Sequence, residues 1–128
     1  MSSIQAAIDR AETILPGTPA AEGMPDPRWQ AIIAISEFIH SEPEAVWSFV
    51  LQWAERGDGD LRMCLATCLL EHLLEHHFDE YFPRVEEAAE ASTALSDVVS
   101  RCWKFGQAED PTRMARFDRL KRRCQRAG

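Results

Sequence analysis

The sequence lacks the features that place a protein in a membrane or direct it out of the cell. No apolar run approaches the roughly 18 residues that a membrane-spanning helix needs. The opening residues, Met-Ser-Ser-Ile-Gln-Ala-Ala-Ile-Asp-Arg, have no basic region followed by an apolar one, so no signal peptide is visible. The cysteines form no C-x-x-C motif; they are Cys64, Cys68, Cys102 and Cys124. We therefore expect a cytoplasmic protein with reduced thiols and no membrane partner.

The common sequence signatures of enzymes are also missing. There is no glycine-rich loop of the kind that holds phosphate groups, no nucleophile elbow and no convincing order of serine, histidine and aspartate. These absences argue against the usual nucleotide-binding proteins and serine hydrolases. We expect a protein that needs no cofactor and is not an enzyme.

Charge is present but unevenly distributed. The 128 residues carry a formal net charge of −7. Residues 1–100 contain 5 Lys/Arg and 18 Asp/Glu, a net charge of −13, whereas residues 101–128 contain 9 Lys/Arg and 3 Asp/Glu, a net charge of +6. A chain of this length, with 45% hydrophobic residues, is expected to form one domain over residues 1–128. Its acidic body should repel nucleic acid and favour a basic partner.

The hydrophobic pattern has the helical period almost throughout, and no segment alternates convincingly like a strand. Residues 16–25 are rich in proline and glycine and are expected to form a loop, while Asp26-Pro27 and Asp110-Pro111 are typical of helix starts. The pattern predicts about seven helices, over 2–15, 26–40, 43–56, 60–77, 79–91, 93–105 and 112–125. Because short turns join most of them, we expect an all-α fold, a short stack of antiparallel helical hairpins that forms an α-solenoid or an irregular helical bundle.

Two of the predicted helices have similar sequences. PRWQAIIAISEFI, starting at Pro27, aligns with LRMCLATCLLEHL, starting at Leu61, at an offset of 34 residues, which lies in the range of helical repeats. The stretch 57–73, GDGDLRMCLATCLLEHL, resembles the second-helix signature of HEAT-type repeats. The signature positions are Asp58, Leu61, Arg62, Leu65, Ala66 and Leu69. The resemblance covers residues 26–106 and implies stacked antiparallel helix pairs with a role in binding or scaffolding.

A histidine pattern in the fourth predicted helix has two interpretations. His72-Leu73-Leu74-Glu75-His76 matches the H-x-x-E-H pattern of inverted zinc metallopeptidases. Two histidines four residues apart on a helix can bind one zinc ion, and the glutamate can polarise a water molecule. The same histidines also lie at the border of the leucine face, where an imidazole is half buried. We expect this second arrangement, so that a zinc-dependent hydrolase using His72, Glu75 and His76 is the less favoured alternative.

The acidic residues between Glu42 and Glu90 point to a protein partner. A cluster of one sign costs self-repulsion, but it speeds encounter with a basic protein. Trp47 lies off the centre of its helix's apolar face and would suit an interface anchor, whereas the other tryptophans, including Trp103, are expected in the core. We therefore expect a non-enzymatic protein-binding module, such as an adaptor, a scaffold or an immunity-type inhibitor. Its predicted contact residues are Trp47, Glu71, Glu75, Asp79, Glu80, Glu86, Glu87 and Glu90.

The basic C-terminal helix, Arg113 to Arg126, also has two interpretations. Met114, Phe117 and Leu120 form an apolar stripe surrounded by arginine and lysine, and such a helix can bind nucleic acid. Alternatively, the stripe packs on the acidic body and the helix closes the stack. We expect the packed helix, because the net charge of −13 elsewhere opposes nucleic acid. A nucleic-acid-binding protein using residues 113–126 is the alternative.

Overall fold

The computed structural model describes residues 3–127, and these residues form helices and connecting segments without a β-strand. The all-α prediction is therefore confirmed. The elements are α1 (Ile4–Ile14), α2 (Pro27–Ser36), α3 (Pro43–Arg56), α4 (Gly59–Cys64), the π-helix η1 (Leu65–Leu70), α5 (Glu71–Ala91), α6 (Thr93–Ser100), the 3-10 helix η2 (Gly106–Glu109) and α7 (Pro111–Ala127). Across residues 3–127, no helix combines the length and the apolar character that crossing a membrane requires.

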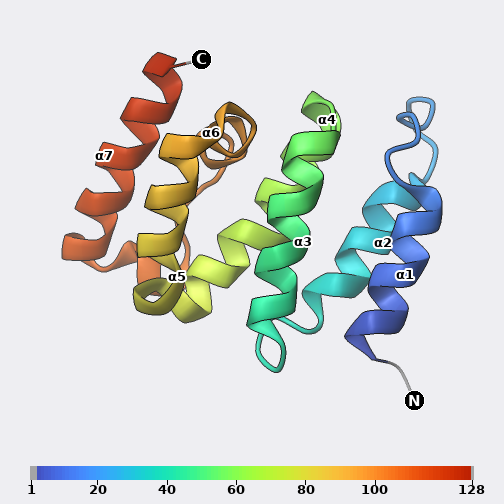
Figure 1. The fold of residues 1–128 in the computed structure, drawn as a ribbon, viewed down its shortest axis with the longest axis horizontal. Helices are drawn as coiled ribbons and strands as arrows, with labels where there is room; N and C mark the ends of the chain where they lie inside the picture. The colour runs from blue at the N-terminus through green and yellow to red at the C-terminus, as the bar shows by residue number, and fades with distance from the viewer. Residues whose placement is uncertain (1–2, 128) are drawn as a thin grey trace.

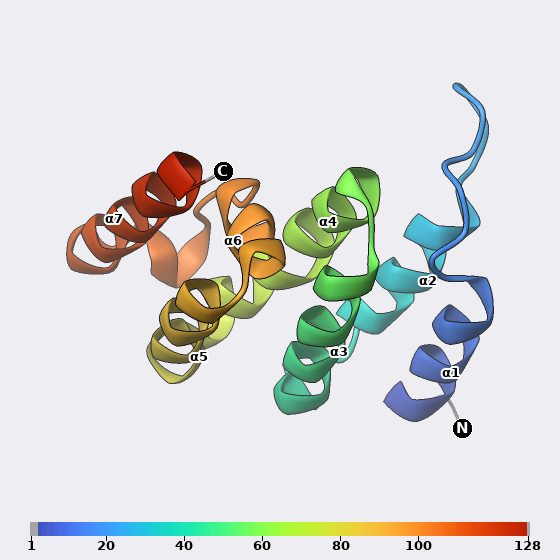
Figure 2. The ribbon, with the colours of Figure 1, turned by 45° about the horizontal axis from the view of Figure 1, so that its top comes forward.

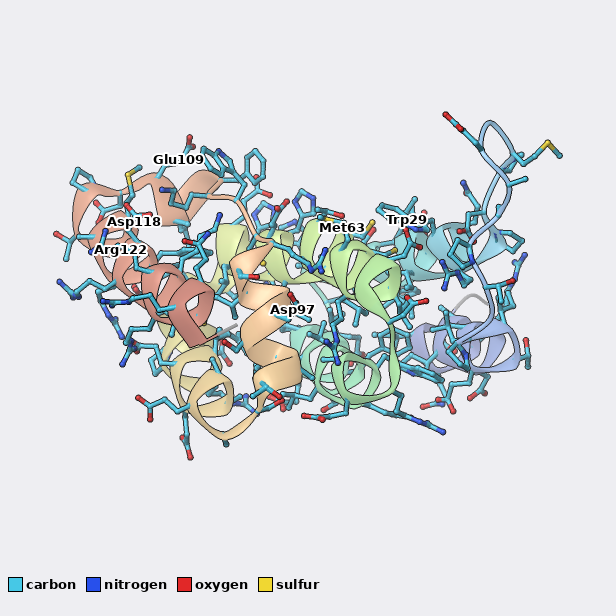
Figure 3. The ribbon with its side chains drawn as sticks, turned by 90° about the horizontal axis from the view of Figure 1, so that it is seen from above. Trp29, Met63, Asp97, Glu109, Asp118 and Arg122 are labelled. Carbon is cyan, nitrogen blue, oxygen red and sulfur yellow. The ribbon has the colours of Figure 1, made fainter. Side chains whose placement is uncertain are left out.

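The helices succeed one another along the long axis of the molecule, as Figure 1 and Figure 2 show. The pair α1 and α2 lies at one end, α3 and α4 lie in the middle, and α6 and α7 lie at the other end. Figure 3 shows the same order from above, with Trp29 towards the N-terminal end, Met63 and Asp97 between, and Arg122 at the C-terminal end. The buried apolar side chains form one continuous cluster that links these elements.

Local sequence determines where several helices begin. Asp26 precedes Pro27, and its carboxylate accepts a hydrogen bond from the Arg28 N–H at 2.9 Å. Helix α3 begins at Pro43 and α7 at Pro111, as expected for proline in a first helical turn. In α1 the Ser3 hydroxyl accepts from the Ala6 N–H at 3.2 Å, while the predicted start at Ser2 lies outside the described residues. Residues 16–25 form the predicted loop.

The predicted helices over 60–77 and 79–91 are joined without a loop. Through η1 the Glu71 N–H donates to the Ala66 carbonyl, five residues earlier, which is the π-helical pattern. At His77 the backbone leaves the helical region, with φ −136° and ψ 41°. The side chain of Gln107 bonds the main chain on both sides of this kink. Its Nε2 donates to the His76 carbonyl at 3.0 Å, and its Oε1 accepts from the Phe78 N–H at 2.9 Å.

Helix α6 is shorter than predicted and ends at Ser100 instead of residue 105. The Trp103 N–H donates to a carboxylate oxygen of Glu71 at 2.7 Å and not to a carbonyl of its own helix. Gly106, with φ +54°, then redirects the chain into η2. The early end of α6 places Trp103 in solvent, which corrects the expectation that this tryptophan lies in the core.

Two arginines at equivalent positions of the 34-residue offset make similar contacts. Arg28 forms an ion pair with Asp60, and Arg62 forms one with Asp97 at 3.3 Å. In both cases the arginine of one helix binds an aspartate of a later helix, so the two contacts link successive layers of the stack. At the 34-residue offset Asp60 aligns with Ala94 and not with Asp97, so only the arginines are equivalent, and the resemblance to HEAT-type repeats stays a prediction.

Candidate protein-interaction surface

Two aromatic side chains on the segment between α6 and η2 face solvent. Trp103 is 60% exposed and Phe105 is 39% exposed. The Phe105 ring stacks on the His72 ring of α5, with 6.1 Å between the ring centroids and 17° between the planes. We call Trp103, Phe105 and His72 the aromatic surface. Exposed rings leave apolar surface area in contact with water, which is unfavourable. Binding of a protein partner would bury that area.

The backbone under the aromatic surface is fixed by polar contacts. Glu71 was predicted to be a partner contact, but its side chain is buried and accepts the Trp103 N–H. Lys121 of α7 donates to the Cys102 carbonyl at 2.5 Å. Lys104 pairs with Asp118 of α7 at 2.5 Å. These contacts hold the segment to both α5 and α7, so little conformational entropy would be lost on binding.

Gly106 allows the segment to lie close to α5. Besides its positive φ, a Cβ atom at this position would lie 2.5 Å from the Glu75 Cγ and 2.9 Å from the Glu75 carbonyl oxygen. A larger residue would therefore push the segment away from the helix. No local sequence pattern predicts this close approach to Glu75.

Two ammonium groups lie beside the Trp103 ring. The ammonium groups of Lys104 and Lys121 each lie 5.1 Å from the centroid of its ring, at cation–π distance. Sequence reasoning missed this surface because it extended α6 to residue 105. The available signal was the run of alternating aromatic and basic residues, Trp103-Lys104-Phe105, directly before Gly106.

The three residues of the H-x-x-E-H pattern do come together. The His72 Nδ1 lies 2.8 Å from the Glu75 carboxylate, and the His76 Nε2 lies 3.5 Å from the same oxygen. The His40 ring of the preceding hairpin lies 4.3 Å from the His76 ring, between centroids. His40, His72 and His76 line an open cavity of about 250 Å³. Glu75 therefore bridges two half-exposed imidazoles in the manner of a polar surface cluster.

A search of residues 3–127 finds no group of three or more His, Cys, Asp or Glu side chains placed to hold a metal ion. The His77 Nε2 lies 3.0 Å from the Ile39 carbonyl. The zinc interpretation of the pattern thus gains no third ligand from the described residues.

The structure corrects the prediction for Trp47. Its side chain is buried, and its ring lies 6.4 Å from the ring of Tyr81, between centroids. The kink at His77 brings the second half of α5 against α3, so a face of α3 that the sequence pattern left open is covered. Tyr81 also donates to Glu44 of α3 at 3.2 Å, and Arg84 pairs with the same carboxylate at 2.6 Å. Trp47 cannot serve as an exposed anchor.

Three of the predicted acidic contact residues pair with α7 instead of facing a partner freely. They join α5 to the basic helix in the pairs Asp79 with Arg113 at 2.7 Å, Glu86 with Arg116 at 2.6 Å, and Glu90 with Arg123 at 3.4 Å. The hydrogen bonds from Arg113 lower the pKa of Asp79 below its usual value. The predicted packing of the basic helix on the acidic body is therefore confirmed. Glu80 and Glu87 are exposed and make no ion pair within residues 3–127.

A basic groove lies between α5 and α7. Its volume is about 410 Å³, and it is lined by Glu86, Arg119, Arg122, Arg123 and Arg126. Arg119, Arg122 and Arg126 are exposed. The groove thus keeps three exposed arginines, although Arg123 in its lining pairs with Glu90 of α5.

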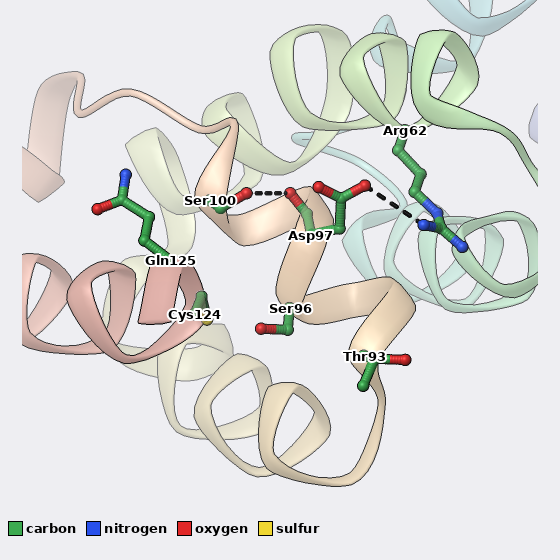
Figure 4. Close-up of a pocket in the computed structure, with 7 residues that line it drawn as sticks. All are labelled: Arg62, Thr93, Ser96, Asp97, Ser100, Cys124 and Gln125. Atoms are coloured by element: carbon green, nitrogen blue, oxygen red, sulfur yellow. Dashed lines mark hydrogen bonds and ion pairs between the residues drawn. The ribbon is translucent and has the colours of Figure 1, made fainter. Parts of the chain in front are cut away.

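The cavity shown in Figure 4 lies between α4, α6 and α7 and has a volume of about 440 Å³. Its lining residues are Arg62, Thr93, Ser96, Asp97, Ser100, Cys124 and Gln125. Asp97 is bound to Arg62, and the Ser100 hydroxyl donates to the Asp97 carbonyl at 2.6 Å. No histidine is among these described lining residues, so the serines and Cys124 have no neighbouring imidazole base of the kind that activates a nucleophile.

Glu71 gives a first prediction, which concerns pH. Burial raises the pKa of its carboxyl above the usual value, although the Trp103 N–H, His72 and Lys121 act in the opposite direction. A carboxyl with a raised pKa binds more protons in the folded state, so its contribution to stability falls as pH rises above about 4.5. In Glu71→Gln, which keeps an oxygen acceptor for Trp103, we expect a smaller loss of stability between about pH 4.5 and 7 than in the wild type.

The control for this prediction is Glu71→Ala, which leaves the Trp103 N–H without its acceptor. That variant should lose about 1–3 kcal/mol at neutral pH. Urea unfolding at several pH values measures both effects. Identical pH profiles for the wild type and Glu71→Gln would show that the Glu71 charge is not perturbed by burial.

A family model matches most of the chain. The family is described as a family of unknown function (DUF6869), and its sequence model matches residues 19–124. Comparisons with curated proteins and with solved structures find no match.

Proposed function

We propose that this chain, which belongs to a family of unknown function, is a non-enzymatic protein-binding module. It would work as an adaptor, a scaffold or an inhibitor. The observation that carries the proposal is the pair of exposed rings, Trp103 and Phe105, on a backbone held to α5 and α7. Preorganised aromatic side chains supply much of the binding energy at protein interfaces. In this proposal the aromatic surface takes the place of Trp47 as the anchor.

The partner's charge follows from what remains exposed. Ion pairs within the fold already involve Asp79, Glu86 and Glu90. The acidic groups that remain for a basic partner are Glu80 and Glu87, together with the net charge of −7. We propose that these charges steer encounter while the aromatic surface makes the short-range contact. The four free thiols support the cytoplasmic setting that we expected from the sequence.

Replacing both rings should remove most of the binding. In Trp103→Ala/Phe105→Ala, retention of a partner from an extract of the native host should fall at least about tenfold, because one hot-spot residue contributes about 2 kcal/mol or more. The matched control is Met24→Ala/Ile33→Ala, which removes two other large apolar side chains with exposures of 64% and 42%. Quantitative mass spectrometry of the retained proteins provides the measurement. Equal retention by all three proteins would refute the aromatic surface as the contact.

One observation favours a second function, the binding of nucleic acid. The groove between α5 and α7 places several arginines together, where they could contact phosphate groups. The same retention experiment distinguishes the two functions if the bound nucleic acid is measured as well. Nucleic acid that is retained by Trp103→Ala/Phe105→Ala, but lost in Arg119→Ser/Arg122→Ser, would favour this alternative.

A further inference from the structure

Two cysteines lie in contact at the junction of α4 and η1. Cys64 is the last residue of α4 and Cys68 lies in η1, one helical turn later. Their sulfur atoms are 3.9 Å apart, close to van der Waals contact. Cys64 is buried, whereas Cys68 is partly exposed. Only one of the two thiols is therefore open to a reagent, and the other can react only with its neighbour.

The hydrogen bonds and the pKa values of the two thiols also favour reaction at Cys68. The Cys64 S–H donates to the Cys68 sulfur, and the Thr67 hydroxyl lies 4.0 Å from that sulfur. The hydrogen bond from Cys64 lowers the pKa of Cys68 to about 7, despite the opposing effect of burial, and Thr67 and His72 act in the same direction. Donation to Cys68 and burial raise the pKa of Cys64 far above its usual value. The exposed sulfur is thus the better nucleophile.

We infer that Cys68 and Cys64 form a thiol-oxidation site, at which a low-molecular-weight disulfide converts the pair into an intramolecular disulfide. The inference is independent of the proposed binding function. It rests on the contact between the two sulfur atoms and on the access to only one of them. To form the bond, the sulfur atoms must approach from 3.9 Å to about 2.05 Å.

The reaction has two exchange steps. The Cys68 thiolate attacks one sulfur of glutathione disulfide, the reagent's S–S bond breaks, and one glutathione leaves as a thiolate that takes up a proton. Cys64 then gives up its proton and attacks the Cys68 sulfur of the mixed disulfide, releasing the second glutathione as a thiol. The protein loses two hydrogen atoms in total, and one glutathione disulfide is reduced to two thiols.

The other two cysteines serve as internal controls. Cys102 is buried, and burial raises its pKa well above the usual value. Its sulfur also lies within 3.8 Å of the Ala66 carbonyl and 3.5 Å of the Val98 carbonyl, to which it donates. Cys124 is buried on α7. Their side chains are only 1% and 5% exposed, and neither sulfur makes a sulfur–sulfur contact within the described residues, so both should react slowly.

The test is incubation of the full chain with glutathione disulfide, followed by intact-mass measurement and peptide mapping. The wild type should lose two hydrogen atoms, with the new disulfide joining Cys64 to Cys68. Cys64→Ser should stop at a stable adduct of one glutathione on Cys68, and Cys68→Ser should react on the order of tenfold more slowly. Cys102→Ser should behave like the wild type.

Peptide mapping of the wild type needs no variant and therefore gives an answer even if a substitution disturbs folding. An adduct found first on Cys102 or Cys124 would overturn the inference. So would a wild-type glutathione adduct on Cys68 that never converts to the intramolecular disulfide, or an unchanged rate in a folded Cys68→Ser.

Discussion

Replacing Arg28 with alanine is expected to lower the free energy of unfolding by roughly 3–5 kcal/mol, because it removes a large buried side chain together with the hydrogen bonds of its guanidinium. The Arg28 side chain is 2% exposed. Its guanidinium donates to the Pro16 carbonyl at 3.0 Å, pairs with Asp60 and lies 3.5 Å from Asp26. The substitution would leave these acceptors without their cation and would open a cavity between the loop 16–25 and α4.

The matched control is Arg62→Ala, because Arg62 occupies the equivalent position 34 residues later. Its side chain is 26% exposed, and its partner Asp97 also binds Arg101 at 3.1 Å. Asp97 therefore keeps a cation after the substitution, and we expect a loss of only about 1–2 kcal/mol. Urea unfolding measures both variants. Equal losses would mean that burial does not distinguish the two arginines.

The helix starts could be predicted because they depend on neighbouring residues. In each of two Asp-Pro pairs, Asp26-Pro27 and Asp110-Pro111, the aspartate caps the helix and the proline fixes φ at its first residue. Helices α2 and α7 therefore begin where expected. The end of α6 could not be predicted in this way. It is set by the Glu71 carboxylate, which lies 32 residues earlier in the sequence and takes the Trp103 N–H. Long-range hydrogen bonds of this kind leave no local pattern.

The burial of Glu71 was missed for a different reason. Projection of a sequence onto a helix assumes 3.6 residues per turn, but η1 is a π-helix with an extra residue per turn. Residues after it are rotated by about 100° relative to the projection. A residue assigned to the solvated side can then face the core. The candidate site depends on this rotation, because Glu71 holds the segment that exposes Trp103.

Three of the predicted acidic contact residues find their counter-charges in a distant part of the sequence. The acidic excess of residues 1–100 and the basic excess of residues 101–128 were assigned to different roles, yet the fold brings them together as Asp79 with Arg113 and Glu86 with Arg116. Opposite net charges within one chain favour internal pairing before external binding. The charge distribution therefore predicted the packing of α7 on the body, whereas the contact residues stay a prediction.

The second large effect is expected for Phe117→Ala on α7, which should lower the free energy of unfolding by roughly 3–5 kcal/mol. Phe117 is buried, and its ring lies 5.8 Å from the ring of Phe82 of α5, between centroids. Leu120 and Cys124 continue the same buried stripe. The stripe, and not the ion pairs beside it, should hold α7 in place, because partly exposed ion pairs contribute only about 0–1 kcal/mol each.

Arg123→Ala is the matched control on the same helix. It breaks the pair with Glu90, in which both side chains are at least half exposed, so we expect a loss of at most about 1 kcal/mol. Thermal and urea unfolding of the full chain, followed by circular dichroism, measure both variants. A helix that served as a free nucleic-acid arm would make no apolar contact with the body. Phe117→Ala would then unfold like the wild type, and that result would contradict the packed arrangement of α7.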